Sequence, residues 1–464
     1  MERTPGRRDA PPAARRAVWA WALFDVATQP VFTLIATFVF APYFAAQLAE
    51  SPAEGQAMWG FAAGAAGLAV GLLSPPLGAI ADRTGRRKRW IAAFSALIVA
   101  GSALLWFTPP GAPNAVAFAL AGFALATIGT ECATAFTNAM MPSLAPPEAL
   151  GRLSGLGWAL GYVGGLVALG FALSFLSADP DDGRTLIGLE PLFGLDPKTF
   201  EGDRAVGPLT ALWYLVFVTP LFLFAPDQRG GLPVASAVRA GLRDLRRTLA
   251  GLRGSRDLTL FLLAHMLYVD GLSALFAFGG IYGAGALGWG TIEIGVFGIL
   301  VIVAGVIGAL IGGWLDDRIG PQRVIAGSLA LLVVSAVVIV SIERARVLFV
   351  VPVDPKVVDD ALFASTPERL FIAVALVLGA AAGPLQSASR TLLVRLAPPG
   401  KLTQSFGLFA LSGKVTSFLG PTAVAIVTAL TDSQRVGVAV LMGFFLAGGA
   451  LLTLVREPER PAAR

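Results

Sequence analysis

The sequence is poor in charged residues, in cysteine and in histidine. Only 14% of its 464 residues are charged, against about 25% in an average soluble domain, so most of the chain does not meet water. The single cysteine, Cys132, lies in an apolar run and excludes disulfide bonds and a cysteine metal site. With one histidine, His265, and with glycine-rich stretches confined to apolar runs, no catalytic centre or phosphate-binding loop is indicated. We therefore expect no enzymatic activity, no metal and no cofactor.

Apolar residues make up 55% of the chain, which has a mean hydropathy of +0.73 and contains 54 glycines. Apolar runs of about 18 residues or more are long enough to cross a bilayer as helices. The sequence therefore predicts an all-α membrane protein with twelve transmembrane helices. The predicted spans are 19–48, 57–81, 90–108, 114–141, 152–177, 208–225, 257–284, 292–315, 322–341, 368–396, 404–430 and 436–455.

The basic residues gather in the connections on one side of these spans. That side carries 25 of the 35 Lys and Arg residues, in the segments 1–18, 82–89, 142–152, 226–256, 316–323, 395–403 and 456–464. The short connections on the other side, 49–56, 109–113 and 285–291, carry none. The positive-inside rule then predicts a multi-pass protein of the cytoplasmic (inner) membrane with both termini in the cytoplasm. The rule also accounts for the net charge of +5, so no nucleic-acid partner is expected.

Repeated segments indicate that the chain is duplicated. Leu144-Ala-Pro-Pro147 returns as Leu396-Ala-Pro-Pro399, at an offset of 252 residues. A charged turn at Asp82 returns at Asp316, at an offset of 234 residues. This pattern predicts two pseudo-symmetric six-helix bundles, related by an axis along the membrane normal.

The predicted organisation has five parts. They are a cytoplasmic tail at 1–18, a six-helix bundle at 19–225, a linker at 226–256, a second bundle at 257–455 and a tail at 456–464. Within the linker, apolar residues such as Val238 and Leu242 recur at helical spacing among arginines. This pattern predicts an amphipathic helix on the anionic inner leaflet, with a regulatory partner site as the alternative.

Ionisable residues inside the predicted spans are the candidates for function. Each costs about 2.5–3.5 kcal/mol to insert, so each needs a partner or a wet cavity. The five that lie well inside a span are Asp25, Glu131, Asp270, Arg390 and Lys414. Four polar residues lie on the same helix faces as these ionisable residues, or at equivalent depths in the membrane: Gln29, Asn138, Tyr162 and Gln386. The 252-residue offset aligns Asn138 with Arg390 and Tyr162 with Lys414, so both bundles are polar at equivalent depths, which favours a substrate pathway.

These residues allow more than one interpretation. Asp25 and Arg390 either bind the substrate or form a structural or gating ion pair between the bundles. Lys414 either binds the substrate or neutralises Glu131 or Asp270. The two carboxylates are also candidate proton carriers, because a position near the bilayer centre favours the protonated form.

The charged turn itself has a separate interpretation as a conformational latch. Asp82 lies where the second predicted helix ends, and could accept hydrogen bonds from the first amides of a neighbouring helix, where the helix dipole favours an anion. The arginines beside it would pair with acids or carbonyls in only one state; alternatively, they only set the topology. The latch residues are Gly78, Asp82, Arg83, Gly85 and Arg86, echoed by Asp316, Arg318 and Gly320.

The repeated turn resembles the loops after the second and eighth helices of the major facilitator superfamily. Other stretches resemble one of its branches, the fungal vacuolar amino-acid effluxers linked to autophagy and their bacterial relatives. These stretches include Trp21-Ala-Leu-Phe-Asp25, Tyr268-Val-Asp-Gly271, Gln386-Ser-Ala-Ser-Arg390 and Phe406-Gly-Leu-Phe-Ala-Leu-Ser-Gly-Lys414. The chain departs from that branch after Asp25, where it reads Val26-Ala-Thr-Gln29 in place of Trp-Ala-Asn-Ser.

The resemblance implies the major facilitator fold, with helices one, four, seven and ten around a central cavity. It also implies the export of amino acids. We expect a secondary transporter of amino acids or related small polar metabolites that works by alternating access, is coupled to protons and is a monomer in the lipid bilayer. Other functions compatible with the same residues are a sugar or drug permease, a lipid scramblase or exporter, and a non-transporting receptor. The ionisable residues inside the spans count against the receptor, which has little need of them.

Overall fold

The computed structural model describes residues 15–227, 231–251, 255–283, 287, 289, 291–342, 346–353 and 363–457. Most of the predicted tail 1–18, most of the tail 456–464 and parts of the linker 226–256 lie outside these residues. The described chain is almost entirely helical, as the sequence predicts.

Helices before the linker form the N-terminal half. The first span consists of α1 (Arg15–Pro30), a π-helical segment (Val31–Phe38), α2 (Phe40–Tyr43) and a second π-helical segment (Phe44–Leu48). The others are α3 (Pro52–Thr84), α4 (Arg87–Leu104), α5 (Ala115–Asn138), α6 (Leu150–Phe175) and α7 (Glu201–Phe224).

The linker helix α8 (Val234–Gly251) leads to the C-terminal half. This half contains α9 (Arg256–Tyr282), α10 (Thr291–Ile319), α11 (Pro321–Val340), α12 (Thr366–Leu396), α13 (Leu402–Ser412), α14 (Leu419–Thr431) and α15 (Gln434–Thr453). A short antiparallel hairpin joins β1 (Arg346–Val347) to β2 (Val351–Pro352) between α11 and α12.

Eleven helical segments of the described chain are long and apolar enough to cross a membrane, and α14 is a shorter apolar helix. The twelve predicted spans are therefore present, but the eleventh, predicted as one helix over 404–430, is broken between Ser412 and Leu419. Pro421 explains the break, because it lacks the N–H that a continuous helix would need at that position. In the first turn of α14 the missing N–H costs nothing.

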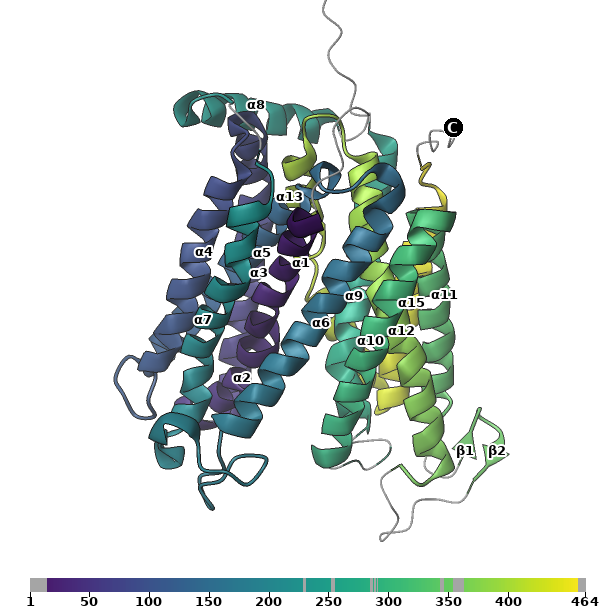
Figure 1. Ribbon diagram of the computed structural model, residues 1–464. Coiled ribbons are helices and arrows are strands. Elements are labelled where there is room, and N and C mark those ends of the chain that lie inside the picture. The colour runs from purple at the N-terminus through teal and green to yellow at the C-terminus, as the bar shows by residue number, and fades with distance from the viewer. Residues whose placement is uncertain are drawn as a thin grey trace, which may run out of the picture.

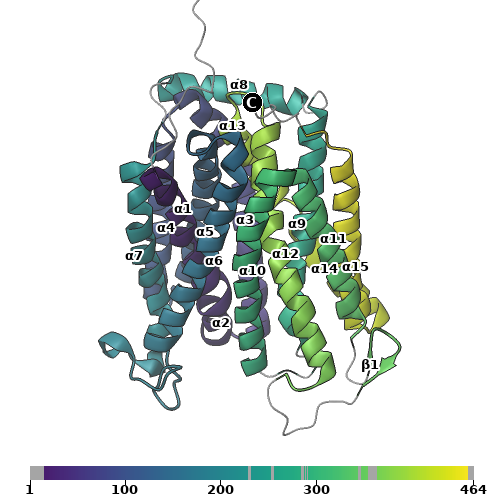
Figure 2. The ribbon, with the colours of Figure 1, turned by 45° about the vertical axis from the view of Figure 1, so that its right-hand side comes forward.

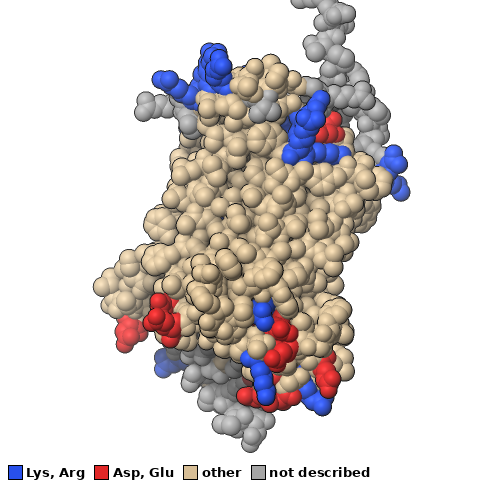
Figure 3. Space-filling model, turned by 90° about the vertical axis from the view of Figure 1, so that its left-hand side faces the viewer, with Lys and Arg blue, Asp and Glu red and all other residues tan. Residues whose placement is uncertain are grey.

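The two ends of the molecule differ (Figures 1 and 2). Helix α8 lies across one end, where α1 begins and α15 ends; we call this the linker end. The hairpin lies at the opposite end, called the hairpin end. On the face in Figure 3, Lys and Arg outnumber the acidic residues at the upper end, Asp and Glu mix with Lys and Arg at the lower end, and the belt between the ends is bare of charge. An apolar belt of this kind is what a bilayer requires of the surface it covers.

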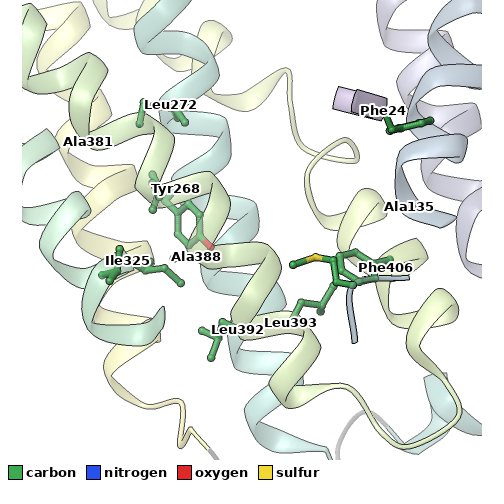
Figure 4. Close-up of a cluster of buried hydrophobic side chains, with 14 of the residues drawn as sticks. Phe24, Ala135, Tyr268, Leu272, Ile325, Ala381, Ala388, Leu392, Leu393 and Phe406 are labelled. Carbon is green, nitrogen blue, oxygen red and sulfur yellow. The ribbon is translucent and has the colours of Figure 1, made fainter. Parts of the chain in front are cut away.

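The interior of each half is apolar (Figure 4). In the C-terminal half, Tyr268 of α9, Ile325 of α11 and Leu392 of α12 are buried in one cluster. Several buried polar side chains, among them Asn138, Ser154 and Arg390, lie where helices of the two halves meet, and that is where the candidate site is found.

Candidate functional site

Asp82 joins the two halves at the linker end. It lies in the last turn of α3 and accepts hydrogen bonds from the backbone amides of Thr403 (3.1 Å) and Gln404 (2.9 Å), in the first turn of α13. Gly78 allows this approach, since a Cβ there would lie 2.5 Å from the Thr403 carbonyl oxygen. The predicted capping of a neighbouring helix by Asp82 is confirmed.

The counterpart of Asp82 is Asp317, which the sequence interpretation missed. Asp317 accepts hydrogen bonds from the amides of Gly151 (2.8 Å) and Arg152 (3.3 Å) in the first turn of α6. Thr403 and Gln404 follow Gly151 and Arg152 by 252 residues, so the two contacts are symmetry mates.

The alignment of Asp82 with Asp316 is therefore wrong by one residue. The order Asp-Arg-x-Gly in the sequence aligns Asp82 with Asp317, and that signal could have found the residue. Asp316 is buried behind it and forms an ion pair with Arg395 of α12, at 3.7 Å. Arg318 stacks on Trp314 in its own helix, with its guanidinium carbon 3.7 Å from the ring centroid.

The arginines of the first turn have different partners from one another. Arg87, not one of the predicted latch residues, is buried and donates to Asp82 (3.4 Å) and to the Thr403 hydroxyl (3.0 Å). Arg83 pairs with Asp244 of the linker helix at 2.5 Å. Arg86 is exposed, and its side chain makes no hydrogen bond or ion pair with the described residues. Arg87, and not Arg86, is therefore the arginine of this turn that contacts Asp82.

The two turns reverse direction through glycines in the left-handed region. Gly85 has φ 72° and Gly320 has φ 96°, values that side chains other than glycine rarely adopt. Both were predicted as latch residues, and both end the helix that carries the capping aspartate.

A second polar layer surrounds Arg390 of α12, whose side chain is buried with 4% exposure. Its Nη1 donates to Asp25 Oδ2 and to Asn138 Oδ1, both at 3.1 Å. Its Nε donates to the Ser154 hydroxyl at 3.0 Å, and Nη2 donates to the Ser154 carbonyl at 2.8 Å. Asp25 and Arg390 therefore form an ion pair between the halves.

The guanidinium of Arg390 has little capacity left for a ligand. It lies near the rings of Trp21 and Trp158, with its carbon 5.7 and 5.2 Å from their centroids. Four hydrogen bonds to three residues use most of its five N–H donors. The partners come from α1, α5 and α6, so this one side chain holds three helices of the other half.

The polar face of α1 packs on the glycines of α6. A Cβ at Gly157 would lie 2.4 Å from Asp25 Oδ2, and one at Gly165 would lie 2.6 Å from Gln29 Cγ. Gln29 thus lies in a contact between two helices of the N-terminal half, where only glycine leaves room for its side chain.

A third layer lies deeper, at Glu131 of α5 and Lys414 in the break of the eleventh span. Lys414 Nζ lies 2.6 Å from Glu131 Oε1, and the side chains are 32% and 17% exposed. Nearby in depth, Gln386 Nε2 donates to the Tyr162 hydroxyl at 3.0 Å. Both contacts join the halves, and Lys414 neutralises Glu131.

Asp270 does not take part in these layers. It is fully buried, and it packs beside Thr416 and Gly420 in its own half. His265, which the sequence interpretation left without a role, bonds Ser412 in the same half at 2.8 Å.

A cavity in the C-terminal half is lined by none of the residues of the three polar layers. It is lined by Tyr282, Val424, Ala425, Thr428, Ala429, Gln434 and Val438. This largely apolar lining contains no Asp, Glu, Lys or Arg, so the cavity offers no site for a charged solute.

The halves are closed at the linker end and separated toward the hairpin end. The glycines on one face of α3 show how the distance between the halves changes along the helix. A Cβ built on each glycine reveals how near α13 and the turn after it approach α3. At Gly60 and Gly64, such a Cβ would meet no atom of the described structure within 4 Å. At Gly67 it would lie 3.9 Å from Lys414, and at Gly71 it would lie 2.9 Å from Leu411. At Gly78, nearest the linker end, it would lie 2.5 Å from Thr403. The described conformation is therefore closed at the linker end.

Comparisons with known proteins agree with this architecture. The family described as "Vacuole effluxer Atg22 like" matches residues 148–460, and "Major Facilitator Superfamily" matches residues 4–169. The "Uncharacterized MFS-type transporter YxiO" of Bacillus subtilis is 24% identical over 441 residues, which cover 94% of each chain. "Autophagy-related protein 22" of Cryptococcus neoformans is 28% identical over 63% of this chain and 48% of its own length. The match thus spans about half of that fungal relative.

Solved structures share the fold. The proton:xylose symporter XylE superposes with a TM-score of 0.68 at 14% identity, covering 95% of this chain and 96% of its own. Human MFSD10, an organic anion transporter, gives a TM-score of 0.67 at 17% identity, covering 97% and 100%. The chain belongs to the Atg22-like family and is a multi-pass membrane transporter of the major facilitator superfamily.

Proposed function

We propose that the protein exports an amino acid or a related zwitterionic metabolite by alternating access. The ion pair between Glu131 and Lys414 carries this proposal, because a carboxylate and an ammonium group 2.6 Å apart are the complement of a zwitterion. Lys414 would take the carboxylate of the solute, and Glu131 its ammonium group. The name of the family, which describes effluxers, supports the outward direction.

The position of this pair supports its role as the binding site. Seven residues of α5 separate Asn138 in the second layer from Glu131, which corresponds to about 10 Å along the helix. A solute at Glu131 would therefore lie beyond both closed layers, on the side where the halves separate. Arg390 is occupied by protein groups, so we assign it and Asp25 to a gate between the site and the linker end.

We assign the linker end to the cytoplasm. The concentration of Lys and Arg in the connections at that end supports this orientation. The described conformation would then be open to the outside of the cytoplasmic membrane, and each latch aspartate would have to release its helix before the protein opens inward. With every layer completed within one chain, a monomer suffices.

Glu131 is the proposed proton carrier. Protonation would remove the charge that holds the ammonium group of the solute, so proton and solute would compete for one position, as export in exchange for protons requires.

Counterflow into proteoliposomes tests the proposal. Vesicles loaded with one unlabelled compound each, drawn from amino acids, sugars and cationic drugs, should accumulate the labelled compound only for amino acids. Glu131→Gln and Lys414→Met should abolish the exchange, while the exposed control Glu50→Gln retains it. Exchange of sugars or drugs alone would overturn the assignment, as would lipid scrambling without solute exchange.

A further inference from the structure

A buried carboxylate lies beside the break in the eleventh span. Asp270 of α9 is 0% exposed, and neither of its carboxyl oxygens makes a hydrogen bond of normal geometry with the described residues. The buried Thr416 hydroxyl lies beside the carboxylate and interacts with it, although no hydrogen bond of normal geometry joins the two groups. An ionised carboxylate so placed is strongly disfavoured unless a cation or a set of donors compensates it.

The break supplies further oxygen atoms. The amide of Lys414 bonds Leu411 O in place of Ala410 O, so the regular pattern of α13 ends there. In the described backbone, the carbonyls of Ala410, Ser412, Gly413 and Val415 accept no hydrogen bond. The carbonyls of Ala410 and Ser412 lie in the last turn of α13, at the negative end of its dipole, which favours a positive charge.

We propose that Asp270, the Thr416 hydroxyl and free carbonyls of this break bind a monovalent hard cation, namely sodium. Hard cations take oxygen ligands, and unwound carbonyls between half-helices are a known source of them in transporters. One carboxylate balances one positive charge. A divalent or transition-metal ion is disfavoured, because the described residues contain no cluster of three or more His, Cys, Asp or Glu side chains.

The Lys414 ammonium group does not compete with the cation. It is held by Glu131 of the other half, at 2.6 Å. Thr416 and Lys414 belong to the same turn, so an ion bound at Thr416 would hold the turn that presents Lys414. The consequence for solute binding rests on the proposed function, whereas the ion site itself does not.

Ion binding can be measured without any solute. Purified protein is unfolded thermally in increasing sodium chloride, with choline chloride replacing it at constant ionic strength. A ligand that binds only the folded state stabilises it, so we expect a saturable rise of the unfolding midpoint with sodium and none with choline. Binding of radioactive sodium should saturate at one ion per chain.

Variants locate the site. Asp270→Asn should abolish both effects, and Thr416→Val should weaken them. The control Glu131→Gln/Lys414→Met, which leaves no free ammonium group in the turn, should leave both effects unchanged. Thr416→Val keeps the test decisive if Asp270→Asn does not fold. Equal midpoints in sodium and choline would overturn the proposal, as would stabilisation by acid alone, which would mean that Asp270 holds a proton. Because Glu131→Gln/Lys414→Met should lose transport but keep sodium binding, failure of this inference is distinguishable from failure of the proposed function.

Discussion

Asn138 accepts a hydrogen bond from Arg390, and the two residues are symmetry mates separated by 252 positions. Mates can touch only where the pseudo-twofold axis passes between them. Arg390 and its partners therefore lie on the axis, between the solute site proposed at Glu131 and the latches at Asp82 and Asp317. Rearrangement of the halves has to break contacts in these layers in sequence.

Loss of the latch charges should favour the conformation that is open at the linker end. Asp82→Asn and Asp317→Asn each weaken two hydrogen bonds from an anion to backbone amides, and a bond to a charged group contributes about 1.5–3 kcal/mol. We expect each variant to shift the conformational equilibrium about tenfold or more.

A thiol at the hairpin end reports this shift. In a Cys132→Ser background, Gly64→Cys places a thiol where no atom lies within 4 Å, so it should react rapidly with a maleimide. In the latch variants the hairpin end closes, and the reaction should slow. The control Asp244→Asn removes only the surface ion pair to Arg83 and should react at the original rate. Unchanged labelling in both latch variants would rule out the latch.

Added bulk between the halves should act in the same direction as loss of the latch. A Cβ at Gly155 would lie 2.4 Å from the carbonyl oxygen of Ala309, across the contact between α6 and α10. Gly155→Ala should therefore destabilise the closed linker end by roughly 1–3 kcal/mol and slow the labelling of Gly64→Cys. Gly60→Ala, which adds a methyl group to open space, is the matched control. Equal labelling in the two variants would contradict the expectation.

The sequence predicted those features that depend only on one segment of the chain and on the bilayer or water around it. The twelve spans follow from the thickness of the bilayer, which sets the length of every apolar run. The capping role of Asp82 follows from local chemistry, because an anion at a helix end seeks exposed amides. Neither prediction required knowledge of how the helices pack.

Features that depend on packing were harder to predict. Lys414 pairs with Glu131 and not with Asp270. The lysine lies in the turn that follows the end of α13 at Ser412, so the orientation of its side chain depends on this break in the eleventh span. The apolar run hides this break, although Gly413 and Pro421 signal it. Asp316 and Asp317 are adjacent, so only their partners, Arg395 and the amides of α6, separate their roles.

Replacement of Arg390 should damage folding as well as transport. Lysine has the charge but lacks the planar fork that reaches Asp25, Asn138 and Ser154 together. We expect Arg390→Lys to lower the free energy of unfolding by about 3–5 kcal/mol, measured by thermal unfolding in detergent, because buried polar groups lose their partners. Arg86→Lys, at an exposed position, should match the wild type. A stable Arg390→Lys protein that has lost only solute affinity would instead make Arg390 a ligand.

The pair of Glu131 and Lys414 should separate stability from transport. Lys414→Met alone leaves a partly buried carboxylate without its cation, so the midpoint of unfolding should fall. The double variant Glu131→Gln/Lys414→Met removes both charges, and should recover most of the lost stability because two neutral side chains replace a desolvated ion pair. Transport should stay abolished, since neither end of the zwitterion then has a partner. Thermal unfolding and counterflow are measured on the wild type, the single variants Glu131→Gln and Lys414→Met, and the double variant. Recovery of transport in the double variant would assign the pair a purely structural role.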